Sequence, residues 1–111
     1  MNEYIINKII EWINEGRELC NNNLSYSNNE MLTKGYKIQM EVFDEMLELI
    51  NEYKIFDTLN SKIRERIEML KKKFRKTSDV YQQDILIDRI ECWEMIRERI
   101  NYEITEHLQI K

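Results

Sequence analysis

The chain has 111 residues and a formal net charge of −4, and it contains no proline and only two glycines. Its length fits a single domain, and the scarcity of proline and glycine predicts long helices with few connections between them. Charged residues make up 34% of the chain and hydrophobic residues 42%, a balance that excludes a disordered tail and a membrane span.

The first predicted element is a helix over residues 2–20. Apolar residues recur there at every third or fourth position, as on the buried face of an amphipathic helix. They are Ile5, Ile6, Ile9, Ile10, Ile13 and Cys20. Asparagine tolerates the left-handed conformation at helix ends, so we expect Asn21, Asn22 and Asn23 to end this helix. Residues 21–29 should then form a loop.

A second helix is predicted over residues 28–53. Ser27 and Glu30 have the spacing of a capping box, in which the serine oxygen accepts a hydrogen bond from the first turn and the glutamate reaches back. The apolar residues of this segment cover more than one stripe, which is typical of a helix with neighbours on two sides. They are Leu32, Tyr36, Ile38, Val42, Phe43, Met46, Leu47, Leu49, Ile50 and Tyr53. We therefore expect this helix at the centre of the fold.

Two further helices are predicted over residues 58–76 and 79–107. Asp57 or Thr58 should cap the first of them, and Ser78 or Asp79 the second. Their apolar residues follow the helical spacing: Leu59, Ile63, Ile67, Leu70 and Phe74 in the first, then Leu86, Ile90, Trp93, Ile96, Ile100, Ile104 and Leu108 in the second. A short link joins them, so they should form an antiparallel hairpin. The expected fold is all-α, a four-helix bundle-like single domain over residues 1–111.

The last predicted helix is longer than the other three, at about 30 residues or roughly 45 Å. Its C-terminal half carries Ile100, Ile104 and Leu108, and Ile110 follows. These apolar side chains need cover, and a second copy of the chain would supply it. We therefore predict a homodimer.

Basic residues are concentrated in residues 62–76, where eight lysines and arginines accompany two glutamates, for a local net charge of +6. The eight are Lys62, Arg64, Arg66, Lys71, Lys72, Lys73, Arg75 and Lys76. One interpretation is a surface, led by Lys71, Lys72, Lys73 and Arg75, that meets nucleic-acid phosphates or an acidic partner. The alternative is structural, because cations complement the dipole at a helix C-terminus and an acidic neighbouring helix would neutralise them. The net negative charge of the whole chain favours the structural alternative.

Residue types that build metal and catalytic sites are sparse. His107 is the only histidine, and a di-iron bundle needs two Glu-x-x-His motifs. Cys20 and Cys92 lack the spacing of zinc ligands, so we expect them to be buried thiols of a reducing compartment, and His107 to be a solvated side chain. We predict no cofactor and no catalytic residue. The first residues, Met1 to Tyr4, include no basic residue, so we expect a cytoplasmic protein without a secretory signal or a membrane segment.

One carboxylate motif resembles that of an enzyme family. Asp44-Glu45-Met46-Leu47-Glu48 is similar to the Glu-Glu-x-x-Glu motif of all-helical nucleotide pyrophosphatases of the MazG and dUTPase kind. The resemblance implies a magnesium ion held by Glu45 and Glu48, with Glu41 one turn away, against a nucleoside triphosphate. That family continues with Glu-x-x-Asp, whereas Glu65-Arg66-Ile67-Glu68 ends in glutamate here. The alternative is an ordinary solvated acidic face.

Aromatic residues at the margins of the apolar stripes are the remaining candidates for a binding surface. Trp12, Tyr26, Tyr81 and Tyr102 lie at stripe edges, at helix ends or in loops, and such residues are frequent anchors of protein interfaces. The alternative for each is a ring packed on the bundle with its polar tip in water. We expect a non-enzymatic protein that binds a protein partner as a regulator, inhibitor or adaptor. Its size and acidity are typical of small inhibitors encoded by phages and other mobile elements, including those directed against host defence.

Overall fold

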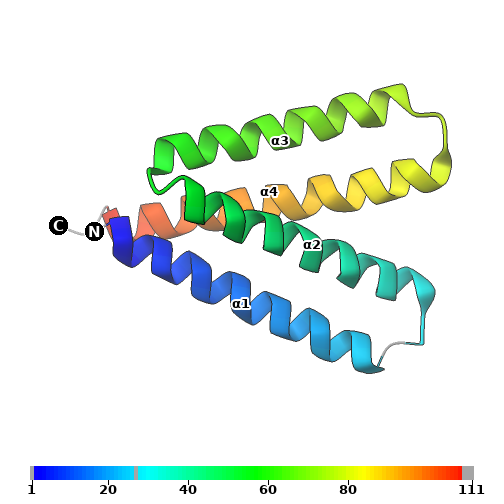
Figure 1. Cartoon of the computed structure of the whole chain (residues 1–111), viewed down its shortest axis with the longest axis horizontal. Coiled ribbons are helices and arrows are strands. Elements are labelled where there is room, and N and C mark those ends of the chain that lie inside the picture. Colours follow the sequence, from blue (N-terminus) through cyan, green and yellow to red (C-terminus); the bar gives the residue numbers. More distant parts are fainter. Residues whose placement is uncertain (1, 27, 109–111) are drawn as a thin grey trace.

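The computed structural model describes residues 2–26 and 28–108, and these residues form four helices and no strand. The helices are α1 (Asn2–Tyr26), α2 (Glu30–Glu52), α3 (Phe56–Lys76) and α4 (Val80–Leu108). Figure 1 shows α1 and α2 as one antiparallel hairpin and α3 and α4 as another. The described chain is therefore the predicted all-α, four-helix bundle-like domain. None of its helices is both long and apolar enough to cross a membrane.

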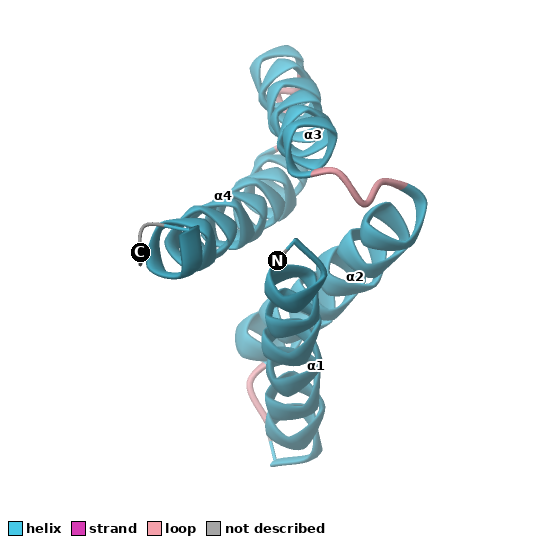
Figure 2. Ribbon diagram, turned by 90° about the vertical axis from the view of Figure 1, so that its left-hand side faces the viewer, coloured by secondary structure: helices cyan, strands magenta, loops and turns pink. Residues whose placement is uncertain are grey.

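The two hairpins contact each other mainly through α2 and α4, and to a smaller extent through α1 and α4. α1 packs mainly on α2 and α3 mainly on α4, while α1 and α3 lie on opposite sides of the α2–α4 pair (Figure 2). Both α2 and α4 are central, although the sequence predicted a central position only for the helix at residues 28–53. The molecule is flat, with extents of 48 × 35 × 23 Å. The smallest extent corresponds to about two helix diameters.

The two ends of the bundle differ in how closely the hairpins approach each other. At one end, here named the closed end, lie the beginning of α1, the end of α4 and the α2–α3 link (Figure 1). The ring of Tyr4 on α1 meets the ring of His107 on α4 there, with 5.1 Å between centroids. At the opposite end, named the open end, the α1–α2 link and the α3–α4 link are well separated (Figure 1).

The core is built from the predicted apolar stripes, and every helix contributes to it. The largest fully buried side chains are Trp93, Ile5, Ile9, Ile13, Met46, Leu59, Ile63, Ile96, Ile100 and Val42. Burial of each aliphatic side chain contributes roughly 1.5–3 kcal/mol to folding. Ile100 is covered within one chain and Ile104 is partly buried against the same core. These two residues therefore need no second copy, while Ile110 and the side chain of Leu108 lie outside the described part.

The prediction that α1 ends at about residue 20 is wrong. α1 continues through Asn21, Asn22 and Asn23 to Tyr26, and no described residue has a positive φ, so the expected left-handed ending is not used. Asparagine costs only a few tenths of a kcal/mol more than other polar residues inside a helix, a cost that packing can override. The half-buried Leu24 continues the helix beyond the asparagines.

The helix starts are set partly by caps and partly by the core. Asn29 caps α2, because its side-chain oxygen accepts from the backbone N–H groups of Met31 and Leu32 at 2.9 and 3.4 Å; the predicted cap Ser27 lies outside the described residues. Asp79 caps α4 as predicted, accepting from the N–H of Tyr81 at 3.0 Å.

The predicted caps Asp57 and Thr58 of α3 are wrong. That helix starts at Phe56, and Ile55 stands at the cap without a side-chain hydrogen bond. Phe56 is buried in the core, and the packing of its ring stabilises a helix that begins two residues earlier than the cap pattern indicated. Asp57 falls in the first turn, where its charge complements the helix dipole.

Candidate functional site

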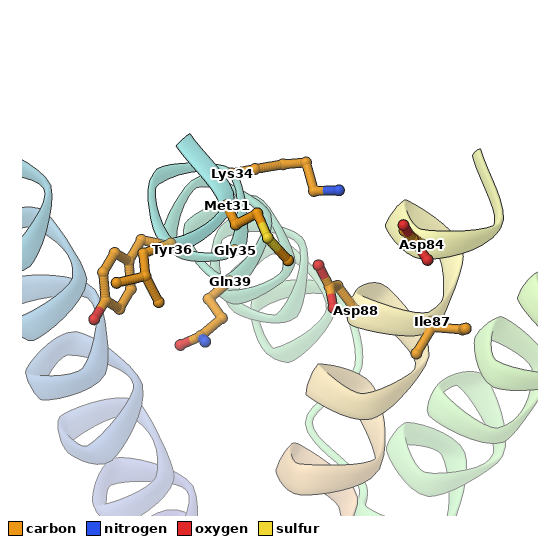
Figure 3. A pocket seen from close by; sticks show the side chains of 9 residues that line it. Met31, Lys34, Gly35, Tyr36, Gln39, Asp84, Ile87 and Asp88 are labelled. Carbon is orange, nitrogen blue, oxygen red and sulfur yellow. The ribbon is translucent and has the colours of Figure 1, made fainter. Parts of the chain in front are cut away.

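A continuous groove separates α2 from α4 at the open end. One hollow of about 370 Å³ and a second of about 250 Å³ share Gly35, Gln39 and Asp88 in their walls, so they form one groove, here named the hairpin groove. The residues that line it are Met31, Leu32, Lys34, Gly35, Tyr36, Gln39, Asp84, Ile87, Asp88, Glu91, Cys92 and Met95. In Figure 3, Met31 of α2 and Asp88 of α4 extend toward one another across it.

The groove exists because α1 follows α2 along its length but leaves α4. Gly16 allows a close approach to α2, since a Cβ there would lie 3.0 Å from ring atoms of Phe43. The Cys20 thiol of α1 donates a hydrogen bond to Gln39 of α2 at 3.3 Å. The aromatic and cation–π contacts between α1 and α4 lie nearer the closed end, where the Arg99 guanidinium is 5.5 Å from the Trp12 ring centroid. Cys20 of α1 is still close enough to Cys92 of α4 to interact with it, and beyond Cys20, the last buried residue of α1, α1 no longer covers the line along which α2 and α4 meet.

Apolar side chains are left exposed along this uncovered line. Met31 is 79% exposed and Leu32 is 53% exposed. Leu32 belongs to the predicted apolar stripe of α2, yet the first buried residue of α2 is Ile38. On α4 the first buried residue is Cys92. The stripe of α2 thus extends beyond the core at Leu32, whereas Leu86 and Ile90 of the α4 stripe are partly buried against the core.

The rim of the groove on α4 is acidic. Asp84, Asp88 and Glu91 are spaced by four and three residues, which places them on one face of the helix. None of the three belongs to an ion pair within residues 2–26 and 28–108. The lining also contains one lysine, Lys34, whose amine lies 5.0 Å from the centroid of the Tyr81 ring. The rim therefore presents three acidic side chains without an ion pair in the described chain, and one lysine, beside exposed apolar side chains.

The opposite side of the α2–α4 contact carries an ion-pair network. Glu45 of α2 accepts from Arg66 of α3 at 2.6 Å and from Arg89 of α4 at 3.4 Å. Arg89 also pairs with Glu41, and the Arg66 guanidinium lies 5.6 Å from the Trp93 ring centroid. One carboxylate thus joins three helices. Charged groups that are half-buried hold such pairs more firmly than fully exposed ones.

Ion pairs engage two of the three carboxylates of the motif that resembles the pyrophosphatases, Glu45 in this network and Asp44 with Arg17 of α1 at 2.8 Å. Glu41 and Glu45 face arginines, and Glu48 is exposed to solvent one turn further on. Glu65 pairs with Lys62 on its own helix at 3.7 Å. In the described part of the chain, no three His, Cys, Asp or Glu side chains are grouped so that they could hold a metal ion. The arrangement favours a structural role for these carboxylates.

The basic segment is divided between paired and free cations. Arg66 and Lys71 pair with carboxylates of other helices, Lys71 with Glu94 of α4 at 3.9 Å. The exposed residues Lys72, Lys73 and Arg75 form no ion pair with any described residue. They lie in the last two turns of α3, at the open end, where they complement the helix dipole. The structural alternative thus holds for part of the segment.

The four candidate aromatic residues do not come together. Tyr26 is 86% exposed at the end of α1, and Tyr81 stands at the start of α4 under the Lys34 amine. Trp12 is half-buried, with its ring edge-to-face on Phe43 at 5.9 Å. Tyr102 lies toward the closed end, where the Arg99 guanidinium is 5.2 Å from its ring centroid. Only Tyr26 and Tyr81 therefore belong to the open end.

Both cysteines are buried free thiols, as predicted. Cys92 lies at the inner end of the groove. Burial raises the pKa of Cys92 to about 12, an effect increased by Cys20 and reduced by Arg89. Burial also raises the pKa of Cys20. Both groups are therefore protonated near neutral pH, a state in which a thiol is a poor nucleophile.

A buried carboxylate on α4 was not predicted. Glu103 is 4% exposed, and it pairs with Arg99 at 2.9 Å and with His107 at 3.1 Å. His107 is half-buried against Tyr4, so the expectation of a solvated histidine is wrong. The spacing of four residues on either side of Glu103 was a readable signal of this cluster. Arg99 and His107 in turn contact Trp12 and Tyr4, so this cluster joins α4 to α1.

Comparison of the chain with protein-family models, with curated proteins and with solved structures finds no match. The hairpin groove is therefore interpreted from its own residues. Sequence reasoning missed it, although a signal was present on α4. Asp84, Ile87, Asp88, Glu91 and Met95 repeat at helical spacing beside the main stripe, and they form a second face that mixes acidic and apolar side chains.

Proposed function

We propose that this chain is a non-enzymatic binding protein, a regulator, inhibitor or adaptor, that contacts a protein partner through its open end. The observation that carries the proposal is the exposure of large apolar side chains around the hairpin groove. Met31, Leu32 and Ile87 line the groove, and Tyr26, Val80 and Tyr81 are exposed elsewhere at the open end. Apolar side chains exposed along a groove are a common mark of an interaction site, and aromatic and methionine side chains are enriched in interface centres.

Three observations support binding over catalysis. The carboxylates Glu41 and Glu45 are held by arginines. The thiols of Cys20 and Cys92 have raised pKa values and are buried. His107 is engaged by Glu103 on the same helix. Each group is therefore committed to the packing of the bundle. Buried thiols also suit the reducing conditions of the cytoplasm, where we propose that the protein acts.

The test compares one groove variant with one matched control variant. Met31→Glu places a charge at the mouth of the groove, on an exposed residue in the first turn of α2, where an acid suits the helix dipole. Met69→Glu makes the same change on α3, at an exposed residue outside the groove. Each tagged full-length chain would be used to capture proteins from extract of its own host. Mass spectrometry would then quantify every retained protein.

We expect a protein that is retained by the original chain and by Met69→Glu but lost from Met31→Glu. A partner retained equally by all three chains would contradict the proposal, because the open end would then not be needed. Loss from Met69→Glu alone would contradict it as well. Circular dichroism of both variants would show that the helices are intact.

A second candidate function is nucleic-acid binding through the end of α3. The observation that favours it is the row of exposed, unpaired cations Lys72, Lys73 and Arg75. Binding to phosphates should weaken steeply with salt, because bound cations release counterions from the nucleic acid. Reversal of Lys72 and Lys73 to glutamate should then abolish retention of DNA or RNA. Unchanged retention, or none by the original chain, would reject this candidate.

The homodimer stays a prediction, and the structure removes one of the reasons for it. Ile100 is buried within a single chain, so a dimer would have to use other surfaces. The open end is the one with exposed apolar side chains. Sedimentation over a range of concentrations tests for self-association directly, and a pure monomer at high concentration would reject the dimer.

A further inference from the structure

We infer that the hairpin groove takes one amphipathic α-helix of the partner, with apolar residues along one edge and lysine or arginine beside them. This inference rests on the proposed function, and it adds the chemistry of the partner segment. It is argued from the course of α1, from the residues on both walls of the groove, and from the charge of its rim.

The shape of the groove favours a helix. At the closed end a helix, α1, already covers the line along which α2 and α4 meet, with Tyr4 against His107 and Trp12 under Arg99. Toward the open end α1 diverges from α4 (Figure 1), and beyond its last buried residue, Cys20, the groove opens along the same line. A partner helix would take the position that α1 vacates. The groove residues of α4 span positions 84–95, which is roughly three helical turns or 17 Å.

The walls of the groove favour an apolar edge on the partner. Met31 and Met95 lie at its two ends and Ile87 between them. Methionine side chains are flexible and polarizable, so they adapt to varied apolar surfaces. Gly35 stands in the α2 wall with nothing within 4 Å of the point where a Cβ would be, which leaves room for an inserted side chain. Helices that enter such grooves present apolar anchors three or four residues apart.

The rim of the groove favours a basic partner. Asp84, Asp88 and Glu91 outnumber the one lysine of the lining, Lys34, and the whole chain is acidic, with a net charge of −4. Opposite charge on the partner would speed its approach and fix its orientation. A second copy of the chain is a poor occupant. Its basic helix is α3, where Met69 is the one large apolar side chain that is exposed, while Ile67 and Leu70 are buried in its own core.

The experiment uses two synthetic peptides of roughly 14 residues, enough for about four turns. Both carry leucine at positions that share one helical edge. The basic peptide has lysine beside this edge, and the acidic peptide has glutamate at the same places. Binding to the full chain would be measured by fluorescence anisotropy. Methyl NMR signals of Met31, Ile87 and Met95 would show where each peptide binds.

We expect the basic peptide to bind at least about tenfold more tightly than the acidic one. Two variants should each weaken it by at least about tenfold: Gly35→Leu, which fills the groove, and the double variant Asp84→Lys with Asp88→Lys. Glu98→Lys is the control, because Glu98 is exposed on α4 outside the groove. It should leave the affinity unchanged.

Equal binding of the two peptides would overturn the inference, and so would binding that Gly35→Leu does not affect. Concentration-dependent changes of the same methyl signals without peptide would show that a second copy occupies the groove, which also overturns it. The proposed function fails separately, when Met31→Glu leaves capture of the natural partner unchanged. If capture depends on Met31 but not on Asp84 and Asp88, the function stands and the basic helix is rejected.

Discussion

The closed end and the open end of this bundle are made from the same four helices, but the apolar faces of these helices are buried to different extents at the two ends. At the closed end Ile5 and Ile100 are fully buried, and Glu103 is enclosed with its partners Arg99 and His107. At the open end Leu32, although part of a predicted apolar stripe, is 53% exposed. Periodicity therefore identifies which face of a helix is apolar. The divergence of the neighbouring helices decides how much of that face is covered.

The largest expected difference between the two ends is in the effect of side-chain truncation. Ile100→Ala removes a fully buried side chain, so the free energy of unfolding should fall by about 2–5 kcal/mol. Leu32→Ala at the open end should change it by less than about 0.5 kcal/mol. Urea unfolding followed by circular dichroism measures both values. Similar losses for the two variants would mean that the open end is packed as tightly as the closed end.

The contact between the hairpins should depend on Glu45. Glu45→Ala leaves Arg66 and Arg89 without their shared carboxylate, and the expected loss is about 1–2 kcal/mol because these groups are only partly buried. The loss should shrink at high salt, which screens the pairs. Glu48→Ala, one turn away on the exposed side of α2, serves as the control. Urea unfolding at two salt concentrations would measure the loss, and an equal loss in Glu48→Ala would show that the network does not hold the hairpins together.

Cys92 lies where the groove meets the core, and its titration tests whether water reaches the thiol from the groove. Its pKa is raised from 9.0 to about 12, so between these values the folded chain keeps a proton that the unfolded chain releases. The stabilising contribution is fully present below pH 9 and declines as pH rises toward 12. At pH 10 the loss should be about 1 kcal/mol.

Stability measured in steps from neutral pH to about pH 10 should therefore decline less in Cys92→Ala than in the original chain. Each protein is compared with its own stability at neutral pH, which removes the cost of the lost side chain. Identical slopes would mean that water reaches the thiol from the groove and that its pKa is ordinary.

The smallest expected effect is the difference in stability between alanine variants of the two glycines. Gly35→Ala should stabilise the chain by about 0.5–1 kcal/mol, because alanine favours the helix and nothing lies within 4 Å of its Cβ. Gly16→Ala should gain nothing, since its Cβ would press on the Phe43 ring at 3.0 Å. Thermal unfolding of both variants measures the difference. A gain at Gly16 equal to that at Gly35 would show that α1 and α2 are less closely packed than the structure indicates.

Much of the fold was predictable because its main signal is local. The spacing of Ile5, Ile9 and Ile13, and of Ile63 and Ile67, specifies a buried helical face regardless of what covers it, and all five residues are in the core. The end of α1 was not predictable in this way. Its asparagines are compatible with a helix or a loop, and the contacts of the following residues decide between the two.

The groove depends on non-local geometry and was not predicted. Its walls are formed by residues about fifty positions apart, such as Gly35 and Asp84, and no local pattern reports the angle between their helices. The same holds for Glu45, whose arginine partners lie 21 and 44 positions away. The cluster around Glu103 differs, because both partners lie four residues away on the same helix. It could have been found from spacing alone.

The position of the Glu45 network has a consequence for how the molecule can deform. The network fastens α2 to α3 and α4 on one side only, opposite the groove. The Glu45 network can therefore act as a hinge between the two hairpins. If the groove widens to admit a bulkier ligand, the hairpins would rotate about this hinge, so that their open-end tips move apart while Ile5 and Ile100 stay packed at the closed end.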